Sequence, residues 1–196
     1  GRIVTRGFPV LLRLELSDLA YAPAEAGWRA STAAGALHVQ MFNPQHAIFE
    51  ARAPIALARA NGDVTNISAD ALIVSVRTAG GALAQAGVEA DNLALDDPAE
   101  DGVLGVQKLV LNVRADPRNG DDAQIALRAM GLALPRPVRS FEALGQDVHT
   151  LQAAIVAERA GLLLRGAEDD PLGPWRAAGG RLRLEALTLR WGALQS

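Results

Sequence analysis

The feature that most constrains the fold is the length of the segments in which apolar residues occupy every second position. From Phe8 to Leu16 the apolar residues Val10, Leu12, Leu14 and Leu16 fall at every second position, with Arg13 and Glu15 on the opposite face. The same period recurs at 48–58, 64–77, 109–113, 125–129, 148–159 and 181–191. Successive side chains of an extended chain point to opposite faces, so this period predicts half-buried β-strands. Several segments have about 10–13 residues, roughly twice the usual strand length, and would each span about 35–40 Å.

Turn signals divide these segments into antiparallel neighbours. Asn61-Gly62 and Asn119-Gly120 predict two hairpins, because both residues adopt the positive φ angles of tight hairpin turns readily. We also expect a pair of strands joined through Gly35, at 28–33 and 37–42, and two long strands at 48–58 and 64–77. The parity of the apolar residues changes near Ala71-Leu72 and near Glu185-Ala186, which predicts β-bulges.

Helical cover for such a sheet is scarce. The segments that favour a helix are 82–87, 139–144 and 171–178, the last with Glu168 to Asp170 before it as a helix start. They are too short to cover a large aliphatic face. We therefore expect a mainly β fold: a long, mostly antiparallel, curved sheet forming a half-barrel or groove, with a few short helices. A closed β-sandwich is the alternative.

Composition excludes several classes of protein. The chain has 196 residues, 49% of them hydrophobic, and we expect a single elongated β-rich domain over 1–196. The net charge of −3 argues against nucleic-acid binding. Cysteine is absent, which excludes disulfides, thiol catalysis and Cys-ligated zinc, and is compatible with the periplasm. The sequence contains no run of about 18 apolar residues, so it predicts no transmembrane helix within this chain.

Residues for chemistry are few. His38, His46 and His149 are far apart, and no nucleophile elbow, phosphate-binding glycine loop or metal-ligand spacing occurs. We therefore predict no enzyme, no catalytic residues, no metal and no cofactor. For ligand binding, Trp28, Phe42 and Phe49 are candidates for the mouth of an apolar groove. Alternatively, the tryptophans pack at the ends of the sheet or under a short helix.

Three stretches resemble a known family. They are Gly7-Phe8-Pro9 before an alternating strand, the strand after Trp28 that ends in Phe42-Asn43-Pro44-Gln45-His46-Ala47-Ile48, and Trp175 to Leu184 followed by Arg190-Trp191-Gly192. Together they resemble the bacterial envelope family catalogued as domain of unknown function 2125. The resemblance implies an N-terminal inner-membrane anchor, a periplasmic location and further strands after Trp191-Gly192, so that this chain would be a piece of a longer protein. It implies no activity and no site residue. The layout is also similar to AsmA-like and YdgA-like envelope proteins, whose curved sheets are thought to handle lipids.

These expectations give three hypotheses about function. The first is a non-catalytic envelope protein whose curved sheet binds or conveys a lipid or other apolar molecule. The second is a structural or protein-interaction module with no small ligand. The third is a hydrolase whose site is assembled in space from distant residues. No nucleic acid is expected as a partner, the membrane would be reached through the anchor, and a protein partner is left open.

Overall fold

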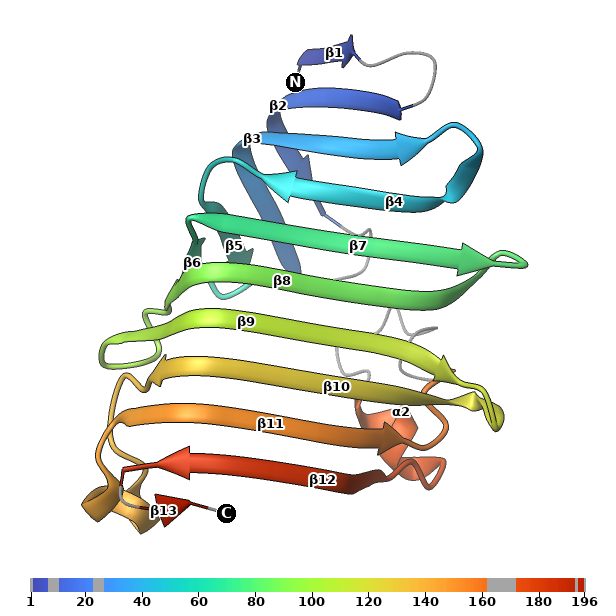
Figure 1. Ribbon diagram of the computed structural model, residues 1–196. Helices are drawn as coiled ribbons and strands as arrows, with labels where there is room; N and C mark the ends of the chain where they lie inside the picture. Colours follow the sequence, from blue (N-terminus) through green and yellow to red (C-terminus); the bar gives the residue numbers. More distant parts are fainter. Residues whose placement is uncertain (1, 7–10, 23–26, 162–171, 193, 196) are drawn as a thin grey trace.

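The computed structural model describes residues 2–6, 11–22, 27–161, 172–192 and 194–195, and it is built almost entirely of β-strands (Figure 1). The strands are β1 (Arg2–Arg6), β2 (Leu11–Tyr21), β3 (Trp28–Gln40), β4 (Asn43–Ala51), β5 (Ile55–Arg59), β6 (Val64–Ser68), β7 (Ala71–Ala79), β8 (Ala82–Asp96), β9 (Val103–Asp116), β10 (Asn119–Ala133), β11 (Asp147–Ala157), β12 (Leu182–Trp191) and β13 (Leu194–Gln195). A 3₁₀-helix η1 (Arg139–Leu144) and the helix α2 (Leu172–Ala177) complete the described elements. The prediction of long strands is confirmed by β8 and β10, which have 15 residues each.

All pairings are antiparallel and join the strands into one sheet, in the order β1-β2-β3-β4-β7-β8-β9-β10-β11-β12-β13. The strands β5 and β6 lie off this path. β5 pairs with the first half of β3, β6 pairs with β5, and β6 also pairs with the end of β8. The pairings β3-β4-β7-β8-β6-β5-β3 therefore close into a ring of six strands. This ring curls one end of the sheet over itself, and Figure 1 shows β5 and β6 behind the long strands.

One face of the sheet is apolar across nine adjacent strands, β2, β3, β4 and β7 to β12. The pairing register aligns apolar residues in three transverse rows, with a glycine at one position. The middle row is Leu14, Leu37, Phe49, Val74, Val88, Leu111, Leu127, Ala153 and Leu187. The rows on either side of it are Leu12, Val39, Ala47, Val76, Ala86, Val113, Ile125, Ile155 and Leu184, and Leu16, Gly35, Ala51, Leu72, Ala90, Leu109, Ala129, Leu151 and Leu189. We call these three rows the apolar face.

Beyond the row that contains Ala90, an irregularity of the backbone crosses four strands, and the apolar face continues on its far side. We call this line the crease. In β8, β9, β10 and β11 the next apolar residue of this face lies three positions away instead of two, at Ala90–Leu93, Val106–Leu109, Ala129–Leu132 and Val148–Leu151. Asn92 (φ 50°) and Gly131 (φ 58°) adopt left-handed backbone conformations in this line. The register between β11 and β12 also shifts there, between Val148 and Thr150. Because each side of the crease keeps its apolar residues on the same face, Leu93, Val106 and Val148 are buried.

Three described elements pack at the margins of the sheet. Ile55 of β5 and Ile67 of β6 pack against the buried cluster of Leu72, Ala90 and Leu93. In α2, the buried Trp175 donates a hydrogen bond from its indole Nε1 to the Glu158 carbonyl (2.8 Å). A Cβ at Gly180 would lie 2.2 Å from the indole, so only glycine fits the corner that leads into β12.

The other end of β12 is closed by η1. Trp191, also buried, donates from Nε1 to the Gly145 carbonyl (3.1 Å), and its ring lies 5.7 Å from that of Phe141. Both tryptophans at the C-terminal end of the chain therefore pack at corners of the sheet.

The fold class is confirmed: the protein is mainly β, with one long, antiparallel, curved sheet in place of the alternative two-sheet sandwich. The helical segment 139–144 and the strand 148–159 are confirmed as η1 and β11. The bulge at Glu185-Ala186 is also confirmed, since Leu184 pairs with Ile155 and Ala186 pairs with Ala154.

Several element boundaries were predicted wrongly. Residues 28–40 form one strand rather than two, because Gly35 allows close approach of the Phe49 ring and makes no turn; a Cβ there would lie 2.6 Å from the ring. The segments 48–58 and 64–77 are each broken into two strands. The first break contains Pro54, which has no N–H for the ladder. Residues 82–87 are part of β8 and not a helix.

The turns also differ in detail. Gly62 (φ 93°) confirms the hairpin after β5, whereas Asn61 keeps a negative φ. The β9–β10 turn lies at Pro117-Arg118, before the predicted Asn119-Gly120, because the Asp116 carboxylate accepts the Arg118 N–H (2.9 Å) and fixes the turn there. The predicted beginning of the first strand at Phe8 to Val10 and the helix start at Glu168 to Pro171 lie outside the described residues.

Candidate functional site

The apolar face is the largest candidate surface for binding. Eight strand spacings of about 4.8 Å give it a width of about 38 Å, and three rows two residues apart give a depth of about 14 Å. Most of its side chains are half-buried, and those on β12 are more exposed: Leu184 is 55% and Leu187 47% exposed. Apolar patches of more than a few hundred Å² are uncommon on monomeric proteins and mark sites of interaction. The face can take up apolar groups but has no groups for chemistry on them.

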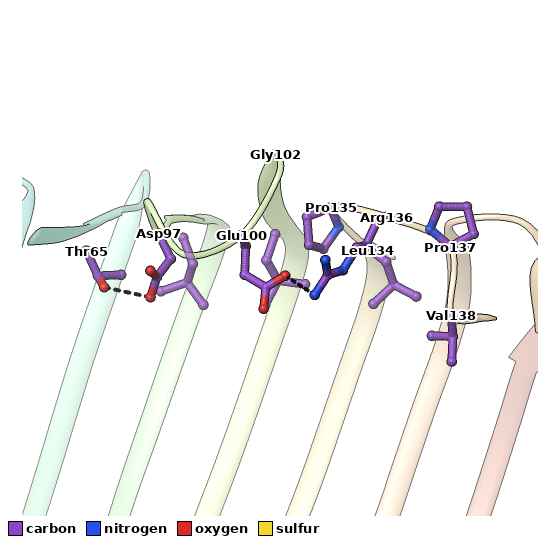
Figure 2. Close-up of a pocket in the computed structure, with 11 residues that line it drawn as sticks. Thr65, Asp97, Glu100, Gly102, Leu134, Pro135, Arg136, Pro137 and Val138 are labelled. Atoms are coloured by element: carbon purple, nitrogen blue, oxygen red, sulfur yellow. Dashed lines mark hydrogen bonds and ion pairs between the residues drawn. The ribbon is translucent and has the colours of Figure 1, made fainter. Parts of the chain in front are cut away.

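A pocket of about 720 Å³ lies where β8, β9 and β10 end beyond the crease (Figure 2). Leu95 and Leu104, which face each other in the β8–β9 pair, and Leu134 line it. The row Leu93–Val106 is the next apolar row along these strands. The apolar lining of the pocket is therefore a continuation of the apolar face.

Two loops form the rim of the pocket. The β8–β9 loop contributes Asp97, Glu100 and Gly102, and the segment after β10 contributes Pro135 to Val138. Gly102 has a φ of 116°, and a Cβ on it would lie 3.1 Å from the Pro135 carbonyl oxygen, so glycine permits this close approach. Across this contact Arg136 forms an ion pair with Glu100, with 2.9 Å between Nη2 and Oε2 (Figure 2).

Asp97 is held by hydrogen bonds from three partners on the other side of the pocket. Its carboxylate accepts bonds from the Arg59 guanidinium, from the Ala99 backbone N–H (2.9 Å) and from the Thr65 hydroxyl (2.8 Å). These bonds, that of Arg59 above all, lower the pKa of Asp97 to about 2. Asp97 therefore stays ionised and tied to β5 and β6, where it fixes the β8–β9 loop to the six-strand ring.

The three predicted groove-mouth residues are not brought together. Phe49 lies in the middle row of the apolar face. Trp28 begins β3 and contacts Tyr21, with 5.9 Å between ring centroids, whereas Phe42 follows the far end of β3 and is 87% exposed. A strand of 13 residues spans about 40 Å, so Trp28 and Phe42 lie at opposite ends of it. Whether any of the three contacts a ligand stays a prediction.

The histidines are also separate. His38 lies on the polar face opposite the apolar one, in a charged network: its Nε2 lies 3.2 Å from Glu50, which pairs with Arg52. His46 is on β4, and His149 is on β11, six strand spacings or about 29 Å from β3. The part of the chain that the structure describes contains no group of three His, Cys, Asp or Glu side chains able to hold a metal ion. Among these described residues, no helix is long and apolar enough to cross a membrane.

Sequence reasoning missed the pocket. It lies between the acidic loop 96–102 and the segment Pro135 to Pro137, and neither stretch has a local pattern typical of a binding site. The available signal was the leucines on either side of that acidic loop. Leu93 and Leu95 alternate just before it, and Leu104 follows it.

Comparisons with known proteins place the chain in one family. No curated protein and no solved structure matches it. One family matches residues 1–196, described as "Uncharacterized protein conserved in bacteria (DUF2125)". A match over the whole chain confirms the resemblance drawn from the three sequence stretches, while the likeness to AsmA-like and YdgA-like proteins stays a prediction. The chain belongs to the DUF2125 family of bacterial proteins.

Proposed function

We propose that this protein binds the apolar part of a lipid or a similar apolar molecule on its apolar face, without chemical change to it. The observation that carries the proposal is the alignment of apolar residues in three rows across nine strands. A sheet with water on both faces would carry polar residues on both of them. Here the polar residues gather on the opposite face, where Lys108 pairs with Asp91.

An acyl chain suits this surface better than a compact ligand. The rows consist of Leu, Val, Ile and Ala with one glycine, Gly35, and a single aromatic residue, Phe49, so they give a smooth surface without a shaped aromatic slot. Each CH₂ group that leaves water contributes about 0.8 kcal/mol, and about ten of them would supply roughly 8 kcal/mol. A long flexible chain on a long shallow face therefore binds by area alone.

The place of action is part of the proposal. The stretches around Trp28, Trp175 and Trp191 resemble an envelope family, and the cysteine-free composition is compatible with an oxidising compartment. We propose the periplasmic side of the inner membrane, with an anchor outside this chain.

Native mass spectrometry of gently purified protein tests the binding. We expect bound lipid mass, which the substitution Leu127→Glu in the middle row removes and the substitution Arg128→Glu on the opposite face keeps. Circular dichroism shows whether each variant keeps its sheet. A clean apo mass for the wild type, or equal lipid content in two folded variants, would refute the proposal.

The free edge of β12 favours a second candidate, a protein-interaction module. Among the described residues β12 pairs on that side only through Arg190 and Trp191, with β13, while Leu182 is 62% exposed. A strand from a partner would slow hydrogen exchange of the β12 amides that point away from β11. Exchange of these amides that stays fast when a candidate partner is added would exclude strand pairing of that partner with β12. The third hypothesis, a hydrolase, has no comparable observation, since its three histidines lie apart.

A further inference from the structure

We propose that the pocket at the ends of β8, β9 and β10 holds a zwitterionic headgroup, an anionic phosphate with an ammonium, of an amphiphile whose chain lies on the apolar face. This inference rests on the proposed function and adds to it the class of ligand. It is carried by the position of the pocket and by the two kinds of ion pair at its rim.

The pocket continues the surface on which an acyl chain would lie. On β10 the half-buried Leu132 beyond the crease is followed two residues later by Leu134, which lines the pocket and is also half-buried. In the same row Leu93 and Val106 are already buried by the protein, so a chain would reach the pocket along β10. Its volume of about 720 Å³ lies within the usual range for small-molecule sites, which are mostly apolar with a few polar groups. A molecule with an apolar chain and a polar end therefore finds both environments in one direction along the strands.

The Arg136–Glu100 pair can exchange partners. The side chains are 60% and 44% exposed, and exposed ion pairs of this kind contribute only about 0–1 kcal/mol. Asp97 differs, because Arg59, Thr65 and the Ala99 N–H saturate its carboxylate. The rim thus offers one cation and one anion, side by side and both open to a ligand.

Charge complementarity selects the headgroup. A phosphate can take two parallel hydrogen bonds from the Arg136 guanidinium, a geometry that arginine favours. The Glu100 carboxylate would then be left without its cation, and an ammonium group on the same headgroup replaces it. A purely anionic headgroup leaves Glu100 facing a second negative charge, and an uncharged headgroup gives the ion pair no reason to open.

The test compares three amphiphiles that share one acyl chain: lysophosphatidylethanolamine, lysophosphatidylglycerol and monoacylglycerol, each below its micelle concentration. Binding is measured by native mass spectrometry to the wild type and to Arg136→Gln, Glu100→Gln and Lys108→Gln. The last is a matched control, because Lys108 forms an exposed ion pair with Asp91 (3.1 Å) on the opposite face.

We expect the wild type to bind lysophosphatidylethanolamine about tenfold more tightly than the other two, a difference of about 1.4 kcal/mol. Arg136→Gln should abolish this preference. Glu100→Gln should lower the affinity for lysophosphatidylethanolamine and raise that for lysophosphatidylglycerol, because Arg136 is then released from its ion pair with Glu100. Lys108→Gln should leave all three affinities unchanged.

Equal binding of all three amphiphiles by the wild type would overturn this inference and leave the proposed function standing. Binding of none of them would overturn both. Glycerophosphoethanolamine, the headgroup without a chain, gives a further arm: we expect it to bind at least a hundredfold more weakly, and equally tight binding would make the pocket a site for a free zwitterion instead of an amphiphile.

Discussion

The crease across β8 to β11 gives a sharp prediction at Gly131. Its φ of 58° is left-handed, and a Cβ there would lie 2.4–2.6 Å from three side-chain atoms of Gln107. The left-handed conformation costs a non-glycine residue about 1–2 kcal/mol. Gln107 is exposed and can turn away, which adds less than about 1 kcal/mol. We therefore expect Gly131→Ala to lower the free energy of unfolding by about 1–3 kcal/mol.

The two contributions can be separated. Urea unfolding gives the free energies of Gly131→Ala, Gln107→Ala and the double variant, and the cycle isolates the contact between the two side chains. The double variant should regain the small steric part and keep the conformational cost. Gly105→Ala on the neighbouring β9 is the control, since its Cβ would meet only Ala133 at 3.6 Å, and we expect it to change stability by less than about 0.5 kcal/mol.

A neutral Gly131→Ala would refute the reasoning. Residue 131 would then not need its positive φ, and the crease would not depend on it. The crease keeps Leu132 on the same side of the sheet as Ala129. Loss of the crease would therefore also disturb the leucine lining of the pocket.

Three other predictions concern single contacts. The pKa of Asp97 is lowered to about 2, so its bonds stabilise the fold fully above pH about 4 and are lost as the pH falls through about 2. Asp97→Asn should therefore flatten the acid limb of the stability–pH profile, and an unchanged limb would contradict this. Gly35→Ala places a Cβ 2.6 Å from the Phe49 ring and should lower the free energy of unfolding in urea by about 1–3 kcal/mol. The double variant with Phe49→Leu should recover part of this loss, and no recovery would mean that another contact is responsible. Trp175→Phe removes the hydrogen bond to the Glu158 carbonyl and should lower the thermal midpoint through a loss of about 1 kcal/mol or more, whereas an unchanged midpoint would show that α2 adds no stability.

Local pattern was sufficient for the class of fold. Alternation such as Leu12-Leu14-Leu16 depends only on the two-residue period of a strand, so it predicts long half-buried strands without any tertiary information. The bulge at Glu185-Ala186 was visible for the same reason, as a change of parity within one strand.

What the sequence did not reveal depends on pairing between distant segments. The corners at Pro54 and at Ala69-Asp70 send β5 and β6 away from the main path, and they pair with β3 and β8 because those strands have unpaired edge left over. Likewise, the crease appears only when the three-residue steps of four strands are aligned. Read one strand at a time, each step looks like the end of a strand.

The candidate site shows the same division. Phe49 was predicted to contact an apolar ligand, and it lies on the apolar face, where its parity placed it. Trp28 and Phe42 were predicted to lie beside it at the mouth of one groove, and separately a break was predicted at Gly35. Once β3 is continuous, the two aromatics lie at its opposite ends. The pair Arg136–Glu100 joins loops 36 residues apart in sequence, and no local pattern predicts such a contact.

The absence of native cysteine allows the central claim to be tested directly. Single thiols are introduced by Leu127→Cys on the apolar face and by Arg128→Cys on the opposite face, and their rates of alkylation are measured with and without monoacylglycerol below its micelle concentration. If the apolar face binds the acyl chain, the amphiphile slows alkylation of the L127C variant several-fold and leaves the R128C variant unchanged. Equal rates with and without the amphiphile at both positions, or equal slowing at both, would contradict the account.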